Sequence, residues 1–412
     1  MLSLALFSGA IACGSNGSQA GPNSQDSGSG TTVIEMFSWW TAPGEAQALQ
    51  ALVSLDEETH LGDIIYNAAL TSGADSRATL QQRLAGGNPP DLFQDTAATL
   101  GAFLTANPGA LQPLDAFLAT QNLTSVIFPQ VLKDVSVGGH VQSMPNNIHR
   151  ENAFFYNKNV FASQGLAPPT TLAEFLAVCQ ALKAAGIPPV AIAYQGWVMR
   201  ILFNDLAMAS MGTAAFYDYM TGGPRDDVAL KAAIDLFGTV VANYVDSTGA
   251  SDSTNFGWDD AAAAMQSGKA AMFLHGDWAK GYFQTLGWTP GMDFGVSGMP
   301  GASDLFWYGV DTFSLPVGAK HPNGTYDFFQ TIGSIDAQVA FNSYKGSTPI
   351  RMDVPLSRLD SEAQVTYADF KNASYSMLTV SKDVWDTAML AFAQNGDKAA
   401  LFQVFVDTPP VP

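Results

Sequence analysis

Two adjacent tryptophans, Trp39 and Trp40, lie in the loop S-W-W-T-A-P-G directly after a predicted strand, where a tryptophan of the core would be unusual. Trp40 is also one of a set of residues that could bind a small polar molecule and that lie at predicted strand ends, in loops or at helix starts: Trp40, Glu45, Gln94, Trp278, Asp311 and Lys345. An indole can cover the apolar face of a sugar ring, while carboxylates, amides and a lysine bond the hydroxyls at its rim. The set therefore indicates a site for a small carbohydrate.

Each candidate also has a simpler interpretation. At least one of the paired tryptophans is expected to pack against its own lobe, and we assign that role to Trp39 while keeping it among the candidate ligand-binding residues. A single charged residue such as Lys345 is more often solvated at the surface. His149 follows a predicted crossover between lobes and could serve the hinge or the ligand. Asn147 and His149 complete the candidate site.

Little in the sequence indicates catalysis or metal binding. The five histidines are dispersed at positions 60, 140, 149, 275 and 321, with no H-E-x-x-H or paired spacing. No G-x-S-x-G elbow marks a nucleophile, and Gly268-Lys269 lacks the upstream glycine of a phosphate-binding loop. We therefore expect no catalytic residue, no metal and no cofactor.

The overall composition restricts the class of partner. The 412 residues are 47% hydrophobic, which suffices for a large core, and a chain of this length favours two domains. The net charge is −19, from 37 acidic and 18 basic residues. Such a field repels phosphate-rich and anionic surfaces, so we expect neither nucleic-acid binding nor attachment to a membrane by charge.

The first thirty residues are predicted to lie outside the fold. Residues 2–12 form a short apolar run that ends before Cys13-Gly14, a pattern typical of a bacterial lipoprotein signal in which Cys13 becomes the lipidated N-terminus. The Gly/Ser-rich stretch up to residue 30 is typical of a flexible tether. The alternative is an unstructured N-terminus without a lipid. Cys179 lies on the apolar face of a predicted helix and is interpreted as a small core residue.

The first part of the chain alternates between strands and helices. Residues 32–37 indicate an edge strand of a parallel sheet, and a helix is expected from Glu45, with apolar residues at helical spacing. We further expect strands near 62–68 and 91–94 and helices near 75–85 and 96–106. This alternation predicts an open α/β sheet whose ligands bind at the carboxyl ends of the strands.

A second α/β unit is predicted after Pro145. It has a strand at 153–156, a helix that begins with the capping box Thr171–Glu174 and ends at Gly186, and a strand at 190–194. Helices are expected at 226–243 and 259–267, and a strand at 270–274. The last third indicates helices around 325–341, 360–371 and 383–394. The prediction is an α/β protein of two lobes with a cleft between them.

Seven segments match one family in order: E-M-F-S-W-W-T-A-P-G-E (35–45), L-A-G-G-N-P-P-D-L-F-Q (84–94), N-N-I-H-R-E-N (146–152), Y-N-K (156–158), W-x6-M-Q-S-G-K-A-A-M-F-L-H-G-D-W-A-x-G-Y (258–282), D-T-F-S-L-P-V-G-A-K (311–320) and F-N-S-Y-K-G-S (341–347). In these segments the sequence resembles the periplasmic glucose/mannose-binding proteins of ABC importers, which belong to the extracellular solute-binding family that includes maltose-binding proteins. The resemblance covers roughly residues 33–394.

The resemblance implies a periplasmic-binding-protein fold of type II, whose hinged lobes are joined by three crossings and close over a sugar. The N-terminal lobe would comprise residues 31–147 and about 309–376, and the C-terminal lobe 148–308 and about 377–412. The protein would be a monomer in the periplasm or at the cell surface. It would deliver a monosaccharide of the glucose/mannose type or a short oligosaccharide to an ABC permease, with no membrane contact except the lipid anchor.

Carried onto matching positions, the resemblance assigns stacking on the sugar ring to Trp40 and Trp278. Glu45, Gln94, Asp311 and Lys345 would hold its hydroxyls. The sequence departs from the family at two places where a histidine is often found. It has Asp95-Thr96 after the D-x-F-Q segment and T-V-S-K-D at 379–383.

Two other functions stay open at this point. A secreted glycoside hydrolase or lyase could use a carboxylate pair, such as Glu45 with Asp311, in a cleft that tryptophans line. A surface adhesin or sensor domain could use the same fold without an importer. Turnover of aryl glycosides would distinguish the enzyme from the binding protein.

Overall fold

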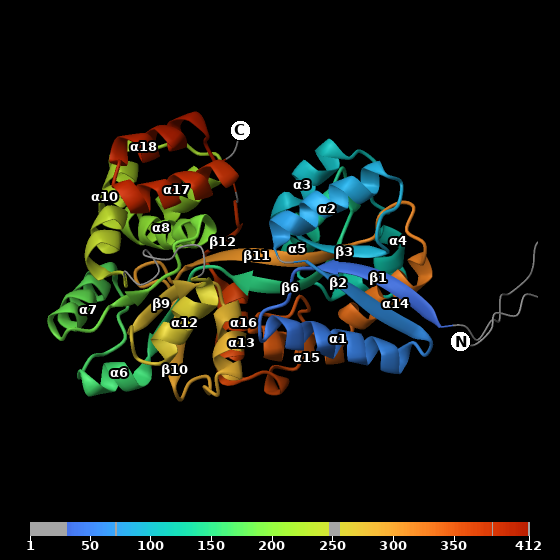
Figure 1. Cartoon of the computed structure of the whole chain (residues 1–412), viewed down its shortest axis with the longest axis horizontal. Helices are drawn as coiled ribbons and strands as arrows, with labels where there is room; N and C mark the ends of the chain where they lie inside the picture. The colour runs from blue at the N-terminus through green and yellow to red at the C-terminus, as the bar shows by residue number, and fades with distance from the viewer. Residues whose placement is uncertain (1–30, 71, 247–255, 381, 411–412) are drawn as a thin grey trace, which may run out of the picture.

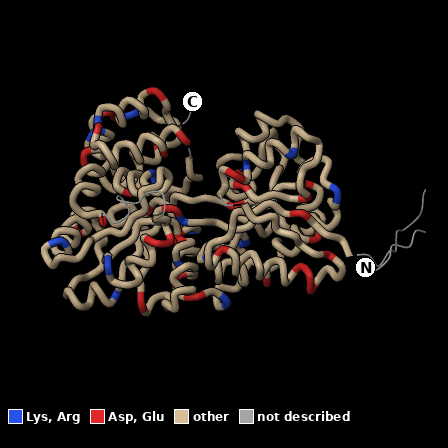
Figure 2. Tube along the Cα trace, in the orientation of Figure 1, with Lys and Arg blue, Asp and Glu red and all other residues tan. Residues whose placement is uncertain are grey.

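Residues 31–70, 72–246, 256–380 and 382–410 are described by a computed structural model in which two α/β lobes lie side by side (Figure 1). The predicted lipidation residue Cys13 and the predicted tether lie outside these residues. Within them, no helix combines the length and the apolar composition that crossing a bilayer requires. Acidic and basic residues are spread over both lobes (Figure 2).

The first lobe is built on a six-stranded sheet of order β12-β11-β3-β1-β2, in which β6 also pairs with β11. Its strands are β1 (Thr32–Ser38), β2 (Asp63–Ala69), β3 (Leu92–Thr96), β6 (Met144–Arg150), β11 (Leu305–Ser314) and β12 (Tyr375–Leu378). β1 pairs in parallel with β2 and β3, whereas β11 is antiparallel to β3 and β6. The carboxyl ends of β1 and β3 therefore meet at one edge, from which the tryptophan loop departs.

Helices and a small hairpin complete the first lobe. They are α1 (Glu45–Thr59), α2 (Gly73–Ala85), α3 (Ala97–Ala106), α4 (Asp115–Thr120), α5 (Pro129–Asp134), α14 (Pro322–Gly333), α15 (Ile335–Lys345) and α16 (Ser361–Asn372), the 3-10 helices η1 (Leu123–Ser125) and η2 (Leu356–Arg358), and the strands β4 (Ser136–Val137) and β5 (His140–Val141). α1 begins at Glu45 as predicted, directly after Gly44 at φ 86°, and it buries Leu49, Leu52 and Val53. A left-handed φ of this kind favours glycine.

The second lobe is built on a four-stranded sheet of order β10-β7-β9-β8. Its strands are β7 (Ala153–Asn157), β8 (Val190–Ala191), β9 (Met272–His275) and β10 (Phe294–Gly298). Its helices are α6 (Lys158–Ser163), α7 (Leu172–Ala184), α8 (Gly196–Met211), α9 (Thr213–Met220), α10 (Asp227–Tyr244), α12 (Trp258–Gln266), α13 (Trp278–Thr285), α17 (Asp383–Asn395) and α18 (Lys398–Asp407). The predicted capping box at Thr171 and Glu174 is present and begins α7.

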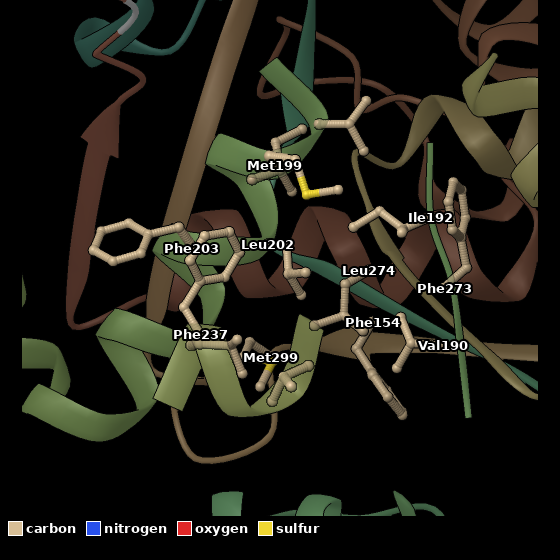
Figure 3. Close-up of a cluster of buried hydrophobic side chains, with 14 of the residues drawn as sticks. Phe154, Val190, Ile192, Met199, Leu202, Phe203, Phe237, Phe273, Leu274 and Met299 are labelled. Atoms are coloured by element: carbon tan, nitrogen blue, oxygen red, sulfur yellow. The ribbon is translucent and has the colours of Figure 1, made fainter. Parts of the chain in front are cut away.

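Each lobe has its own hydrophobic core. The core of the second lobe packs side chains of α8 and α10, such as Phe203 and Phe237, near the sheet residues Phe154 and Leu274 (Figure 3). Cys179 is fully buried in this core, and burial raises the pKa of its thiol to about 12. Its interpretation as a core residue is confirmed.

Strand β11 contributes to both cores. Leu305 and Trp307 pack in the core of the second lobe, whereas Phe306, Tyr308 and Val310 pack in the core of the first. Because successive side chains of a strand point to opposite faces, a single extended segment can join the two cores. The lobes are therefore connected by a packed strand rather than by a loose linker.

Three predicted elements differ in the structure. β1 is not an edge strand, since it pairs on both sides, and the strand expected at 190–194 ends at Ala191. The helix expected at 325–341 is two helices. The break falls at Ser334, whose backbone is extended and whose side chain caps α15 by accepting a hydrogen bond from the backbone N–H of Ala337.

Candidate functional site

A cavity of about 470 Å³ lies between the two lobes. We call it the main cavity. Its wall consists of Trp39, Trp40, Thr41, Ala42, Glu45, Ser72, Gly73, Arg77, Thr96, Ala98, Thr99, His149, Glu151, Gln195, Trp197, Arg200, Trp258, Trp278, Gly309, Asp311, Lys345 and Thr379. The structure thus brings seven of the nine predicted site residues to one cavity, from segments more than 300 positions apart.

The tryptophan loop is fixed by Gln94 on the neighbouring strand. Its Oε1 accepts hydrogen bonds from the Ser38 hydroxyl at 2.7 Å and from the backbone N–H of Trp39 at 3.2 Å. The Ser38 hydroxyl oxygen in turn accepts from the backbone N–H of Trp40 at 3.2 Å. Both tryptophans follow β1 directly, so this bonding sets where each indole points.

The packing roles expected for the two tryptophans are reversed. Trp40 is the residue packed into its own lobe: it is 2% exposed, and its ring lies 5.0 Å from Phe341 and 5.7 Å from Phe313. Trp39 is only partly buried, at the margin of the core. The prediction failed because adjacent residues in a loop have no fixed periodicity that would distinguish the inward side chain from the outward one.

Gln94 and Asn147 are not part of the cavity wall, contrary to the expectation that both contact the ligand. Gln94 is 1% exposed and Asn147 is fully buried. Gln94 holds the tryptophan loop, and Asn147 lies opposite Asp311 in the register of β6 and β11. Both side chains position residues of the wall from behind.

Lys345 and Glu45 form an ion pair beside Trp40. The Lys345 ammonium Nζ lies 2.5 Å from Oε1 of Glu45 and 5.2 Å from the centre of the Trp40 ring. Lys345 is buried at the C-terminal end of α15, and Glu45 is the first residue of α1. The pair offers a ligand both an N–H donor and a carboxylate acceptor within one small region of the wall.

His149 lies between two carboxylates. Its Nδ1 is 2.5 Å from Oδ1 of Asp277, and its Nε2 is 3.0 Å from Oδ2 of Asp311. Burial by itself lowers the pKa of His149, and Lys345 acts in the same direction, but the two aspartates outweigh both and raise the pKa to about 9. The imidazole is therefore protonated at neutral pH. Burial likewise acts to raise the pKa of Asp311, but His149 and Lys345 hold that pKa below its usual value.

The second lobe supplies three tryptophans to the wall of the main cavity. Trp197, Trp258 and Trp278 are each the first or second residue of a helix, in α8, α12 and α13. The ring centres of Trp278 and Trp197 lie 6.1 Å apart. Sequence reasoning missed Trp197 and Trp258 as wall residues. Each directly follows a glycine at a helix start, and Trp278 follows a glycine by two positions, so the shared pattern could have identified them.

A buried histidine stands behind these tryptophans. The ring of His275 is stacked between Trp258 at 5.3 Å and Phe273 at 4.7 Å, and it meets Trp278 edge to face at 4.9 Å. Burial lowers the pKa of His275 to about 3, so this imidazole is neutral. It supports the aromatic wall as an uncharged ring.

Two glycines bring the predicted motifs of the two lobes together. A Cβ on Gly281 would lie 2.0 Å from the carbonyl oxygen of Tyr344, and a Cβ on Gly346 would lie 2.7 Å from that of Asp277. Since real Cβ atoms do not approach so closely, glycine is required at both places. The start of α13, which carries Trp278, and the end of α15, which carries Lys345, are therefore held in backbone contact.

Glu151, Arg200 and Thr379 form a polar group in the wall that sequence reasoning did not identify. The Thr379 hydroxyl donates to Oε2 of Glu151 at 3.0 Å, and the Arg200 guanidinium lies 3.8 Å from the same oxygen and 2.7 Å from Asp386. Burial raises the pKa of Glu151, which Arg200 partly offsets. The signal was absent because Glu151 directly follows β6, Arg200 lies in α8 and Thr379 directly follows β12, without a shared motif.

The carboxylates named for a hydrolytic mechanism are both paired with cations, Glu45 with Lys345 and Asp311 with His149. A general acid needs a raised pKa, whereas that of Asp311 is lowered. This arrangement does not favour the enzyme alternative.

Comparison with known proteins shows to which family the chain is similar. Residues 42–339 match the family described as bacterial extracellular solute-binding protein. An uncharacterized ABC transporter extracellular-binding protein of Pyrococcus horikoshii is 32% identical over 84% of this chain and 77% of its own length. A probable sugar-binding periplasmic protein of Brucella suis is 31% identical over 83% of this chain and 80% of its own length.

A solved structure of a chitin oligosaccharide binding protein superimposes with a TM-score of 0.78, covering 93% of this chain and 100% of that one. At 19% sequence identity, this likeness bears on the fold alone. It confirms the predicted two-lobed α/β architecture.

Proposed function

The chain belongs to the bacterial extracellular solute-binding protein family, and from that premise we propose that it binds a small neutral sugar and delivers it to the permease of an ABC importer. The observation that carries the proposal is the main cavity. Its wall combines partly buried tryptophans of both lobes, Trp39 and Trp278, with charged side chains that can bond the hydroxyls of a sugar. A sugar ring has apolar faces, which stack on aromatic side chains, and a rim of hydroxyls, which bond to polar side chains.

The charges of the wall favour a neutral ligand. Its cationic side chains are each paired with a carboxylate: Arg77 with Asp95, His149 with Asp277 and Asp311, Arg200 with Asp386, and Lys345 with Glu45. An anionic sugar would have to compete with these carboxylates, and the net charge of −19 would oppose its approach. The ligand we propose is a glucose- or mannose-like sugar or a short oligosaccharide of such units.

The proposal is tested by thermal unfolding with a panel of hexoses, pentoses and disaccharides, and with a sugar acid as the charged comparison. A sugar that binds only the native state raises the unfolding temperature by mass action, by an amount that grows with its concentration. At least one neutral sugar is expected to do so, and the sugar acid is not. No response to any neutral sugar would contradict the proposal. Aryl glycosides should remain intact under the same conditions.

We further propose that the protein acts as a monomer at the outer face of the membrane and is anchored by a lipid on Cys13. The apolar run before Cys13 and the Gly/Ser-rich stretch after it support this. Mass spectrometry of the protein extracted from producing cells should find Cys13 as a lipidated N-terminal residue. The Cys13→Ala variant should partition into the soluble fraction, and equal partitioning of both proteins would contradict the anchor.

A further inference from the structure

Arg150 lies at the boundary between the lobes. Its Nη1 donates to Oδ2 of Asp369 at 2.5 Å, and its guanidinium lies over the ring of Phe306 at 4.7 Å. Both partners belong to the first lobe, since Phe306 packs in its core and Asp369 precedes the core residue Phe370 on α16. Nη2 of Arg150 points to the second lobe instead, because a Cβ on Gly298 of β10 would lie 2.2 Å from it.

Nη2 of Arg150 and the carboxyl group of Asp205 are complementary but not bonded. Both are buried, and neither Nη2 nor either oxygen of Asp205 has a hydrogen-bond partner among the residues that the structure describes. Asp205 shares a face of α8 with Met208, whose Sδ accepts from Asn152 at 3.6 Å. Asn152 in turn accepts from Nε of Arg150 at 3.4 Å. Asp205 therefore lies beside the segment that carries Arg150.

The charges around Asp205 leave Arg150 as its partner. Burial raises the pKa of Asp205 well above its usual value, Arg150 acts to lower that pKa, and Glu151 acts to raise it. The other arginine of α8, Arg200, is bonded to Asp386 at 2.7 Å. A buried carboxyl group without a donor and a buried N–H without an acceptor each cost stability. An arrangement of the lobes that joins the two would remove both costs.

Helix α8, which carries Asp205, is fixed to α17. A Cβ on Gly196, the first residue of α8, would lie 2.5 Å from the carbonyl oxygen of Asp386 in α17. The two helices are in such close contact that we expect them to move together. A cavity of about 310 Å³ separates Asp383, at the start of α17, from α2 and α3 of the first lobe. Closure of this gap would carry α8 and Asp205 toward the first lobe, to which Arg150 is bonded.

We propose that Arg150 exchanges partners when the lobes close, from Asp369 in the sugar-free protein to Asp205 in the sugar-bound protein. This inference rests on the proposed function, since sugar is taken to drive the closure. An ion pair that exists in only one arrangement shifts the equilibrium toward it. Asp369 and Asp205 therefore set how readily the protein closes. Neither residue belongs to the wall of the main cavity, so they change sugar affinity without contact with the sugar.

The test is titration calorimetry with whichever of glucose, mannose, xylose and maltose most raises the unfolding temperature. Asp205→Asn should weaken binding by about tenfold, because the closed arrangement loses an ionic hydrogen bond. Asp369→Asn should strengthen binding by about threefold, because the open arrangement loses its own. Asp205→Leu should weaken binding as Asp205→Asn does, yet it should not lower the unfolding temperature without sugar, because it removes a buried carboxyl group that has no donor. A residue that only supports the fold would not change affinity and stability separately.

Asp336→Asn is the matched control. It breaks an exposed ion pair of the first lobe, with Arg358 at 2.8 Å, and should leave sugar affinity unchanged. Small-angle scattering adds a measurement that needs no sugar, in which Asp369→Asn should be more compact than wild type and Asp205→Asn should not. Wild-type affinity in Asp205→Asn would overturn the exchange, and so would wild-type dimensions in Asp369→Asn. If wild type binds no sugar, the proposed function fails, whereas the scattering comparison still decides the exchange.

Discussion

Nδ1 of His149 lies 2.5 Å from Oδ1 of Asp277, and this contact joins β6 of the first lobe to the start of α13 in the second. The other oxygen of Asp277 accepts from the backbone N–H of Arg150 at 2.8 Å, so the carboxylate is held at both oxygens. The residue after Asp277 is Trp278. The position of the aromatic wall is therefore tied to the charge of an imidazole.

The charge of His149 should make stability depend on pH. Its pKa is about 9 in the folded protein and about 6.5 in an unfolded chain, so folding favours the protonated form. The stabilisation is fully present below pH 6.5 and is lost as the pH rises through 9. It amounts to about 3 kcal/mol of unfolding free energy, measurable by urea denaturation at intervals between pH 6 and 10. In His149→Gln this slope should largely disappear, and an unchanged slope would contradict the assignment.

The two neighbouring tryptophans should respond differently to truncation. Trp40→Ala removes a buried ring packed on Phe313 and Phe341, so we expect it to lower the unfolding free energy by about 3–5 kcal/mol. Trp39→Ala should cost less stability and more sugar affinity, because Trp39 is the more exposed of the two in the cavity wall. Denaturation and titration calorimetry on both variants separate the effects. The reverse ranking would restore the packing roles expected from sequence.

Trp278→Ala should weaken sugar binding by about 2–4 kcal/mol, the range of a central aromatic anchor. The ring supplies area to the wall and contacts both His149 and His275. Trp288→Ala is the matched control, because Trp288 stacks on Phe294 away from the main cavity and should affect stability alone. Wild-type affinity in Trp278→Ala would show that this wall is not where the sugar binds.

The Lys345–Glu45 pair should be coupled in stability. Lys345→Met leaves the Glu45 carboxylate in the wall without its cation, and we expect a loss of about 3 kcal/mol. The double variant Lys345→Met/Glu45→Gln should regain part of that loss, because the uncompensated charge is gone. A double-mutant cycle from urea denaturation measures the coupling, and additive losses would mean that the two side chains act independently. Lys345→Met, Glu45→Gln and the double variant should all bind sugar more weakly.

Sugar should bring the lobes closer on one side only. Gly281 and Gly346 already hold α13 against α15, whereas a cavity of about 310 Å³ separates α2 and α3 from Asp383 at the start of α17. Closure should therefore move α17 toward α2 and α3, and small-angle scattering should record a smaller radius of gyration at saturating sugar. Trp278→Ala at the same sugar concentration serves as the control and should stay open. Identical dimensions with and without sugar would argue against closure.

The sequence predicted helices and strands well where local signals were strong. Where the matching motifs were long, it also predicted which residues line the main cavity. Alternating strands and helices, the Thr171 capping box and the start of α1 at Glu45 all follow from short-range chemistry. Helix α8 escaped prediction because eleven of its residues are buried, which leaves no polar face to reveal its period. Glu151 and Arg200 escaped it because only the folded chain brings them together. The roles of Trp39 and Trp40 depend on packing across the sheet, which a loop sequence does not encode.

The dual packing of β11 also bears on the order in which the chain can fold. β3 and β6 lie within the first 150 residues, but both pair with β11, which ends at Ser314. During synthesis the first sheet therefore stays incomplete until three quarters of the chain has been made. Contacts of such long range are slow to form, because a large loop must close first. Residues 31–147 alone would expose an unpaired edge at β3, so neither lobe could be excised or exchanged as one contiguous piece.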